Sequence, residues 1–345
     1  MEIYLTEIAK DGSFILRMDV VEELLSAARA DAIAFVAIVG PPRGGKFMIA
    51  KACSAYLERP KQMELRDQDI FDYNAIRDHD NGYIIALRRT VDFEHMKVYF
   101  IVTQIPRNLD KPKANKLLLW TSMLSSIQIF NIPNQISELD ELRTKIIMQY
   151  NGFIASENIR TVIFLRDVLR GNYEMRKENV GESQVDCYTL PSPGQDIFRA
   201  VPRAAMEFKR ALLDHLRRVV TSLEARTMFG QLVSGSQLLV YLRELDMKNI
   251  RESIKRAREI IRGVLDFRQQ INDRVPHREA IENVLKNLSA EDRKRIEEYI
   301  TIEVKRMQEA GESQRGPVVT VIAENIQSVT VGHHAANDKK NNEQK

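Results

Sequence analysis

The chain has 345 residues, of which 44% are hydrophobic and 29% charged, and its formal net charge is only +3. This composition is typical of a globular protein with room for one large and one smaller domain, and so small a mixed charge argues against nucleic acid as a partner. The two cysteines, Cys53 and Cys187, argue against a disulfide framework and favour a reducing compartment. The chain starts unlike a signal peptide, and no run approaches the roughly 18 apolar residues of a membrane span. We therefore expect a soluble, cytoplasmic protein without a transmembrane segment.

In chain order, the first half of the sequence alternates predicted strands with predicted helices. Asp11-Gly12 predicts a two-residue hairpin turn between residues 2–6 and 13–17, and Asp19 is placed to cap the following helix. The other strands are predicted at 34–40, 83–89, 97–103, 127–131, 160–165 and 186–190. Further helices are predicted to end near Leu57 and to span 115–126 and 137–149. This alternation predicts an α/β fold with a mostly parallel sheet and a site at the carboxyl ends of its strands.

From Pro202 onward the apolar residues follow helical spacing. The residues on the predicted core face of a helix over 201–222 are Met206, Leu212, Leu213, Leu216 and Val219. Further helices are predicted at 236–245, 248–271 and 290–310. The polar end of the chain has the composition of a disordered tail. We predict an α/β domain over 1–222, a small α-helical domain over 223–312 and a tail over 313–345.

One stretch carries a specific chemical signature. Gly40, Gly45 and Lys46 follow an apolar run and precede a predicted helix, in the pattern G-x-x-x-x-G-K of a phosphate-binding loop, or P-loop. Glycines let backbone N–H groups surround phosphate oxygens, the helix N-terminus attracts anions, and the lysine reaches the β- and γ-phosphates. The Ser or Thr that should follow the lysine and hold Mg²⁺ is Phe47, which has no oxygen to offer.

Several collinear segments resemble the atlastins, dynamin-like large GTPases related to guanylate-binding proteins. Arg43 stands within the P-loop where that family has an internal arginine finger, and residues 121–131 resemble the family's helix-to-strand segment after the second switch. Phe164-Leu165-Arg166-Asp167 is similar to the Arg-Asp motif of the family. Cys187–Gly194 resembles the end of its G domain, and residues 233–241 resemble the entry into its middle helical domain. The resemblance covers roughly residues 1–245, and the atlastin membrane anchor has no counterpart.

The resemblance implies a P-loop G domain with a mostly parallel sheet, followed by a truncated helical middle domain. It implies that Asp167 accepts hydrogen bonds from the guanine base and that Arg43 is the catalytic arginine. It also implies that G domains pair face to face, as a homodimer or as a heterodimer with an intact atlastin-like GTPase, and that such a partner could bring the chain to the endoplasmic reticulum. The residues expected to bind GTP or GDP are Gly40, Arg43, Gly44, Gly45, Lys46, Phe47, Arg166 and Asp167.

The departures from the family pattern fall on the magnesium positions. The hydroxyl after the P-loop lysine is replaced by Phe47, the second threonine of the first switch by Asn81, and the second-switch aspartate by Val102. Ile105 replaces the glycine whose N–H serves the γ-phosphate, and Pro106 removes a further donor. Mg²⁺ neutralises charge between the β- and γ-phosphates, so its loss removes a dominant stabilising interaction. The expected function is that of a degenerate GTPase that binds guanine nucleotide with weak or no Mg²⁺ and acts through nucleotide-modulated association.

Two other functions stay open at this stage. One is a slow GTPase in which Lys46 and Arg43 compensate charge and a carboxylate such as Asp80 or Asp110 replaces the metal ligands. The other is a nucleotide-free scaffold, in which Arg43 is a solvated loop residue and Arg166-Asp167 is an ion pair. No metal site is predicted, because the neighbouring side chains of 78–80 point in different directions and no third ligand has suitable spacing.

Overall fold

The computed structural model describes residues 2–26, 32–60, 65–66, 81–153, 159–168, 175–180, 183–192, 202–228, 231–245, 249–286 and 288–312. They belong to two compact units that divide between Arg243 and Glu244. The tail expected over 313–345, and residues 78–80, lie outside the described part of the chain. Among the described residues, no helix combines the length and apolarity needed to cross a bilayer.

The first unit is built on a nine-stranded sheet with the order β1-β5-β7-β4-β8-β9-β11-β10, to which β6 adds by pairing with β7. Pairing is parallel between β4 and β7, β4 and β8, β8 and β9, and β9 and β11. The strands span Glu2–Tyr4 (β1), Ala32–Gly40 (β4), Tyr83–Leu87 (β5), Val91–Phe93 (β6), Met96–Gln104 (β7), Ile127–Pro133 (β8), Arg160–Val168 (β9), Met175–Val180 (β10) and Ser183–Pro191 (β11). The predicted α/β class with a mostly parallel sheet is confirmed.

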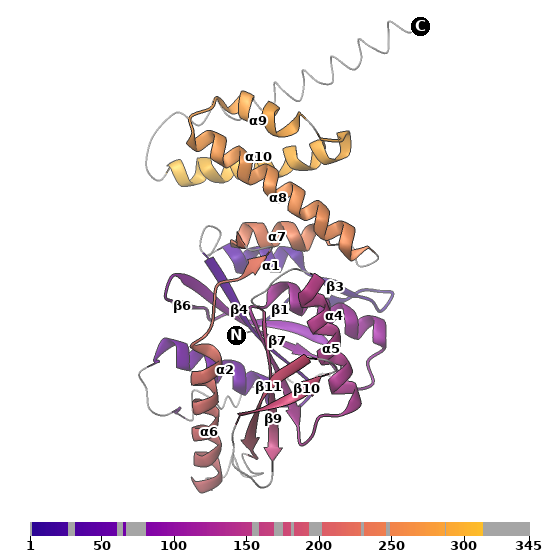
Figure 1. Cartoon of the computed structure of the whole chain (residues 1–345), viewed down its shortest axis with the longest axis vertical. Coiled ribbons are helices and arrows are strands. Elements are labelled where there is room, and N and C mark those ends of the chain that lie inside the picture. The colour runs from indigo at the N-terminus through magenta and orange to yellow at the C-terminus, as the bar shows by residue number, and fades with distance from the viewer. Residues whose placement is uncertain are drawn as a thin grey trace, which may run out of the picture. The chain divides into compact units, whose positions relative to one another are not determined.

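Helices cover both faces of the sheet, so the central strands are buried on both sides (Figure 1). One face packs against α2 (Lys46–Glu58) and α6 (Pro202–Val220), in a core that includes Val102 of β7. The next residue, Thr103, points to the opposite face, where its hydroxyl lies 2.8 Å from that of Thr121 on α4 (Lys111–Leu124). Helix α5 (Glu138–Phe153) packs against α4 on that face.

The N-terminal hairpin differs from the prediction. The paired strands are β2 (Thr6–Ile8) and β3 (Phe14–Leu16), whereas β1 pairs with β5 of the large sheet. The connecting loop is longer than two residues because the Asp11 carboxylate accepts a hydrogen bond from the Ser13 N–H at 2.9 Å, while Gly12 adopts φ 75°. Helix α1 (Met18–Ser26) then follows as expected.

The helices predicted near the C-terminus are present. Helix α7 (Gly235–Glu244) follows a short hairpin of β12 (Thr227–Met228) and β13 (Gln231–Leu232). The second unit contains α8 (Ile250–Asn272), α9 (His277–Leu285) and α10 (Ala290–Glu312), whose apolar faces bury residues such as Phe267, Ile281 and Ile300. Helix α9 was not predicted. On α6 the prediction for Met206 was wrong: it is 65% exposed, because it lies near the start of α6, before the buried stretch that begins at Phe208.

A buried arginine, Arg226, joins the segment between α6 and β12 of the first unit to α4. Arg226 is 1% exposed, and its guanidinium donates to the Ser122 carbonyl at 3.3 Å and lies 3.5 Å from that of Met123. Both carbonyls belong to the last turn of α4, where helical partners are lacking and a cation is favoured. Burial lowers the pKa of Arg226 to about 9.

We expect Arg226→Ala to lower the free energy of unfolding by about 2–3 kcal/mol, because it leaves buried carbonyls unsatisfied and a void behind. The control is Arg243→Ala, which removes a more exposed ion pair with Glu22, of 2.6 Å, and should cost less than about 1 kcal/mol. Urea denaturation followed by circular dichroism measures both. Equal costs for the two variants would contradict a capping role for Arg226.

Candidate functional site

The loop between β4 and α2 has the backbone of a phosphate cradle. Gly45 is the N-cap of α2 and adopts φ 68°, and Arg43 also lies in the left-handed region at φ 56°. Gly44 is buried, and a Cβ there would lie 3.0 Å from the Pro41 carbonyl oxygen and 3.3 Å from the Asn131 amide nitrogen. Because Gly45 has no capping side chain, the donors at this end of α2 are backbone N–H groups.

Lys46 extends from the start of α2 back across this loop. Its side chain is buried, and its ammonium donates to the Pro41 carbonyl at 2.5 Å and to the Gln104 side-chain oxygen at 3.2 Å. Gln104, at the end of β7, also accepts from the Tyr83 hydroxyl at 2.9 Å and donates to the Asn81 carbonyl at 3.1 Å. The lysine charge therefore lies between the P-loop and the carboxyl end of β7.

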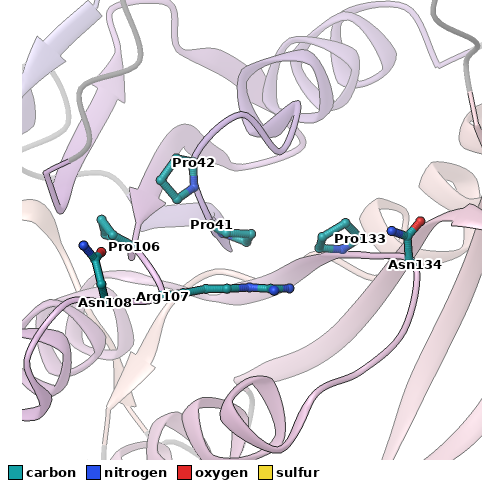
Figure 2. A pocket seen from close by; sticks show the side chains of 7 residues that line it. All are labelled: Pro41, Pro42, Pro106, Arg107, Asn108, Pro133 and Asn134. Carbon is teal, nitrogen blue, oxygen red and sulfur yellow. The ribbon is translucent and has the colours of Figure 1, made fainter.

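A pocket of about 510 Å³ opens beside the P-loop. Figure 2 shows its lining, which comes from the loops that follow β4, β7 and β8: Pro41, Pro42, Pro106, Arg107, Asn108, Pro133 and Asn134. Strand β4 is flanked by β7 on one side and β8 on the other, so the pocket lies where the strand order reverses. This is the usual position of ligands in open α/β sheets.

The loop after β7 is held by bonds within the protein. Arg143 of α5 is buried, and its guanidinium donates to the Ile105 carbonyl at 3.0 Å and to the Pro106 carbonyl at 2.6 Å. Burial lowers the pKa of Arg143. The Ile105 N–H donates to the Gly40 carbonyl at 3.0 Å, so the group expected at the γ-phosphate in an active GTPase is used to join β7 to the P-loop.

Two of the three positions at which the resemblance implies magnesium ligands, 47 and 102, hold apolar side chains. Phe47 packs against the core between the sheet and α2, and Val102 is fully buried in the same core. The Asn81 carbonyl accepts from Gln104. Of the suggested replacement ligands, Asp110 is the N-cap of α4, bonded to the Lys113 N–H at 2.9 Å and ion-paired with its ammonium at 3.0 Å; Asp80 lies outside the described residues. Across the described ranges, no cluster of three or more His, Cys, Asp or Glu side chains is placed to hold a metal ion.

Arg166 and Asp167 lie near the end of β9, one strand beyond β8. Their side chains form an ion pair of 3.1 Å, and Asp167 adopts φ 62°. Arg166 is 8% exposed, its pKa is lowered by burial, and its guanidinium lies 3.8 Å from where a Cβ of Gly44 would be. The structure thus brings Arg166 to the P-loop. The guanine-binding role of Asp167 stays a prediction.

The remaining predicted residue, Arg43, is exposed on the P-loop and is not among the residues that line the pocket. Sequence reasoning missed Arg107 and Asn134 in the lining, and Asn131, whose amide donates to the Gly44 carbonyl. A usable signal existed for all three, because each lies at or just after the carboxyl end of a predicted strand, where side chains of neighbouring strands converge.

Comparisons with known proteins leave the family of the chain open. No protein-family model matches it, and no curated protein matches it. Among 79 matching chains of solved structures is a variant of Era from Aquifex aeolicus, bound to GDP and AlF₄⁻. It is 9% identical with a TM-score of 0.29, over 63% of this chain and 69% of that chain. A likeness this weak does not bear on function, and the resemblance to atlastins stays a prediction.

Proposed function

We propose that this chain is a degenerate P-loop GTPase that binds a guanine nucleotide without Mg²⁺. The observation that carries the proposal is Lys46: its buried ammonium is bonded to the carbonyl of Pro41, a P-loop residue that lines the pocket, and to the side chain of Gln104. A buried cation beside a helix N-terminus is the arrangement that phosphate groups require. Gly44 and Gly45 supply the close backbone approach, and Arg166 adds a second buried cation beside the loop.

Magnesium does not fit this site. Val102 belongs to the hydrophobic core and the partly buried Phe47 packs against it, so neither side chain offers oxygen to a hard cation. Compensation of the charge that develops in hydrolysis would then depend on cationic side chains such as Lys46 and Arg43, without a metal ion, and we expect hydrolysis to be ineffective. This reasoning favours the degenerate GTPase over the slow GTPase.

The guanine preference and the atlastin-like assignment are finer parts of the proposal. They are supported by the sequence segments at 121–131 and 187–194, and by Asp167, which lies on the strand next to β8 with its side chain held by Arg166. Pairing of G domains with a second copy or with an intact relative, and association with the endoplasmic reticulum through that relative, belong to the same proposal.

A nucleotide-free scaffold is the second candidate, and one observation favours it. The side chain of Gln104 and the N–H of Ile105 are satisfied by Lys46, Tyr83 and Gly40 within the protein. The loop after β7 therefore needs no nucleotide to be ordered. A binding measurement separates this candidate from the first.

Titration calorimetry of GTP and GDP, each with Mg²⁺ and with EDTA, tests the proposal. We expect both nucleotides to bind, with dissociation constants that agree within about twofold with and without the metal. Lys46→Ala should weaken binding by about 100-fold, the loss expected when two charge-assisted hydrogen bonds are removed. Lys145→Ala, which removes a partly exposed lysine on α5 that is paired with Glu141 at 2.8 Å, should bind as the wild type does.

Each contrary result has a definite meaning. Tight GTP binding that requires Mg²⁺, with turnover lost in Lys46→Ala, would show an active GTPase. No heat with either nucleotide, from a protein that melts cooperatively, would leave the scaffold.

A further inference from the structure

Arg107 is a cationic residue in the lining of the pocket, and the proposed function gives it no role. It follows Pro106 in the loop after β7, and Figure 2 shows its side chain passing below Pro41 toward Pro133. Among the described residues it has no hydrogen bond and no ion pair, although its neighbours Arg143 and Asp110 are both engaged. An arginine without a partner inside a pocket is a binding group for an anion.

The other residues that line the pocket are uncharged, so they do not neutralise the charge of Arg107. Of the described residues that form it, four are prolines and two are asparagines, and Arg107 alone carries a charge. Proline has no N–H, so these prolines contribute only carbonyl oxygens as polar backbone groups. Within the lining, the positive charge offered to a ligand therefore comes from Arg107, and the buried Lys46 ammonium is bonded to the carbonyl of Pro41, a residue of the lining.

A buried cation, Arg143, lies near Arg107. Arg143 lies close enough to Arg107 for the two guanidinium charges to repel, which contributes to the lowered pKa of Arg143 after the larger effect of burial. Asp140 has the opposite and larger effect, because its negative charge raises the pKa of Arg143. An anion in the pocket would stabilise both cations.

We infer that Arg107 binds the outermost phosphate of a nucleoside triphosphate and supplies the positive charge that a metal ion supplies in active GTPases. The inference rests on the proposed function, since it needs the inner phosphates to be bound at Lys46. A polyphosphate without metal carries several negative charges, and a guanidinium matches two phosphate oxygens at once. The site is therefore selective for triphosphate over diphosphate in the absence of Mg²⁺.

Titration calorimetry in EDTA with Arg107→Ala tests this inference. GTP affinity should fall by about 10-fold or more, whereas GDP affinity should change by less than about threefold, because GDP lacks the outermost phosphate. Arg107→Lys keeps the charge without the planar fork and should give an intermediate loss. Arg107 is exposed, so the variant should melt at the wild-type temperature.

Arg88→Ala is the matched control. Arg88 is also exposed, but it follows β5, which runs antiparallel to β7 with Tyr83 opposite Gln104. Arg88 therefore lies at the opposite edge of the sheet, and its loss should change neither affinity. Wild-type GTP affinity in Arg107→Ala, with binding still lost in Lys46→Ala, would overturn the role of Arg107 and leave the proposed function intact. Equal losses for GTP and GDP would overturn the assignment to the outermost phosphate. If the wild type binds neither nucleotide, the proposed function fails and this inference fails with it.

Discussion

Replacing Gly40 by valine is expected to lower the free energy of unfolding by about 3–5 kcal/mol. A Cβ at this position would lie 2.5 Å from the Asn131 carbonyl oxygen. That oxygen belongs to the backbone of β8, which pairs with β4 up to Val39 and Phe130. A paired, buried strand cannot move aside as a flexible side chain can, so the sheet itself must open. Urea denaturation followed by circular dichroism gives the value.

Gly152→Ala is the control for this prediction. Gly152 lies within α5, and nothing comes within 4 Å of a Cβ built there, so alanine should be neutral or should stabilise by up to about 1 kcal/mol. A Gly40→Val variant that unfolds at the wild-type urea concentration would show that β4 and β8 do not approach as described. If the prediction holds, the first glycine of the P-loop is required by the packing of the sheet, independently of any ligand.

The order of strands and helices in the first unit could be predicted because its central strands are buried on both faces. Apolar runs such as 97–103 can be recognised in the sequence, because glycines and polar residues separate one run from the next. Strand β10 could not be predicted, because it has mostly exposed, polar residues and lies at the edge of the sheet, where β11 is its partner among the described strands. The register of the N-terminal strands depends on β5, which lies about 80 residues away in the sequence.

The candidate site also has a part that could be predicted from the sequence and a part that could not. Residues 40–47 are contiguous, so their local pattern predicts the strand, the loop and the helix that the structure contains. The contacts of Arg143 and Asn131 depend on the order of the strands and on helix packing, which no local pattern encodes. The sequence also predicts that the magnesium ligands are missing at Phe47 and Val102, and the structure adds that Val102 lies in the hydrophobic core and that Phe47 packs against it.

Replacing Val102 by aspartate is expected to destabilise the protein by about 4 kcal/mol or more. Val102 is fully buried between the sheet and the α2/α6 layer, among residues such as Val36 and Phe100. A carboxylate there would lose its hydration without gaining a counter-charge from these neighbours. Burial raises the pKa of such a carboxyl, so the folded state prefers the protonated form and the loss of stability should shrink as the pH falls. Thermal unfolding from acidic to neutral pH measures this dependence.

Val102→Asn separates the charge from the polarity in this experiment. The amide has almost the same size and cannot ionise, so Val102→Asn should cost less than the aspartate at neutral pH, by an amount that disappears in acid. The contrary result would be a Val102→Asp protein that keeps wild-type stability and is stabilised further by Mg²⁺, because only a preserved metal site would accept the charge. Under the proposed function, we expect Val102→Asp to lose stability and Mg²⁺ to have no effect on it. On that proposal Val102 contributes apolar packing where an active GTPase has a carboxylate, so the cost of Val102→Asp measures how far the core depends on this side chain.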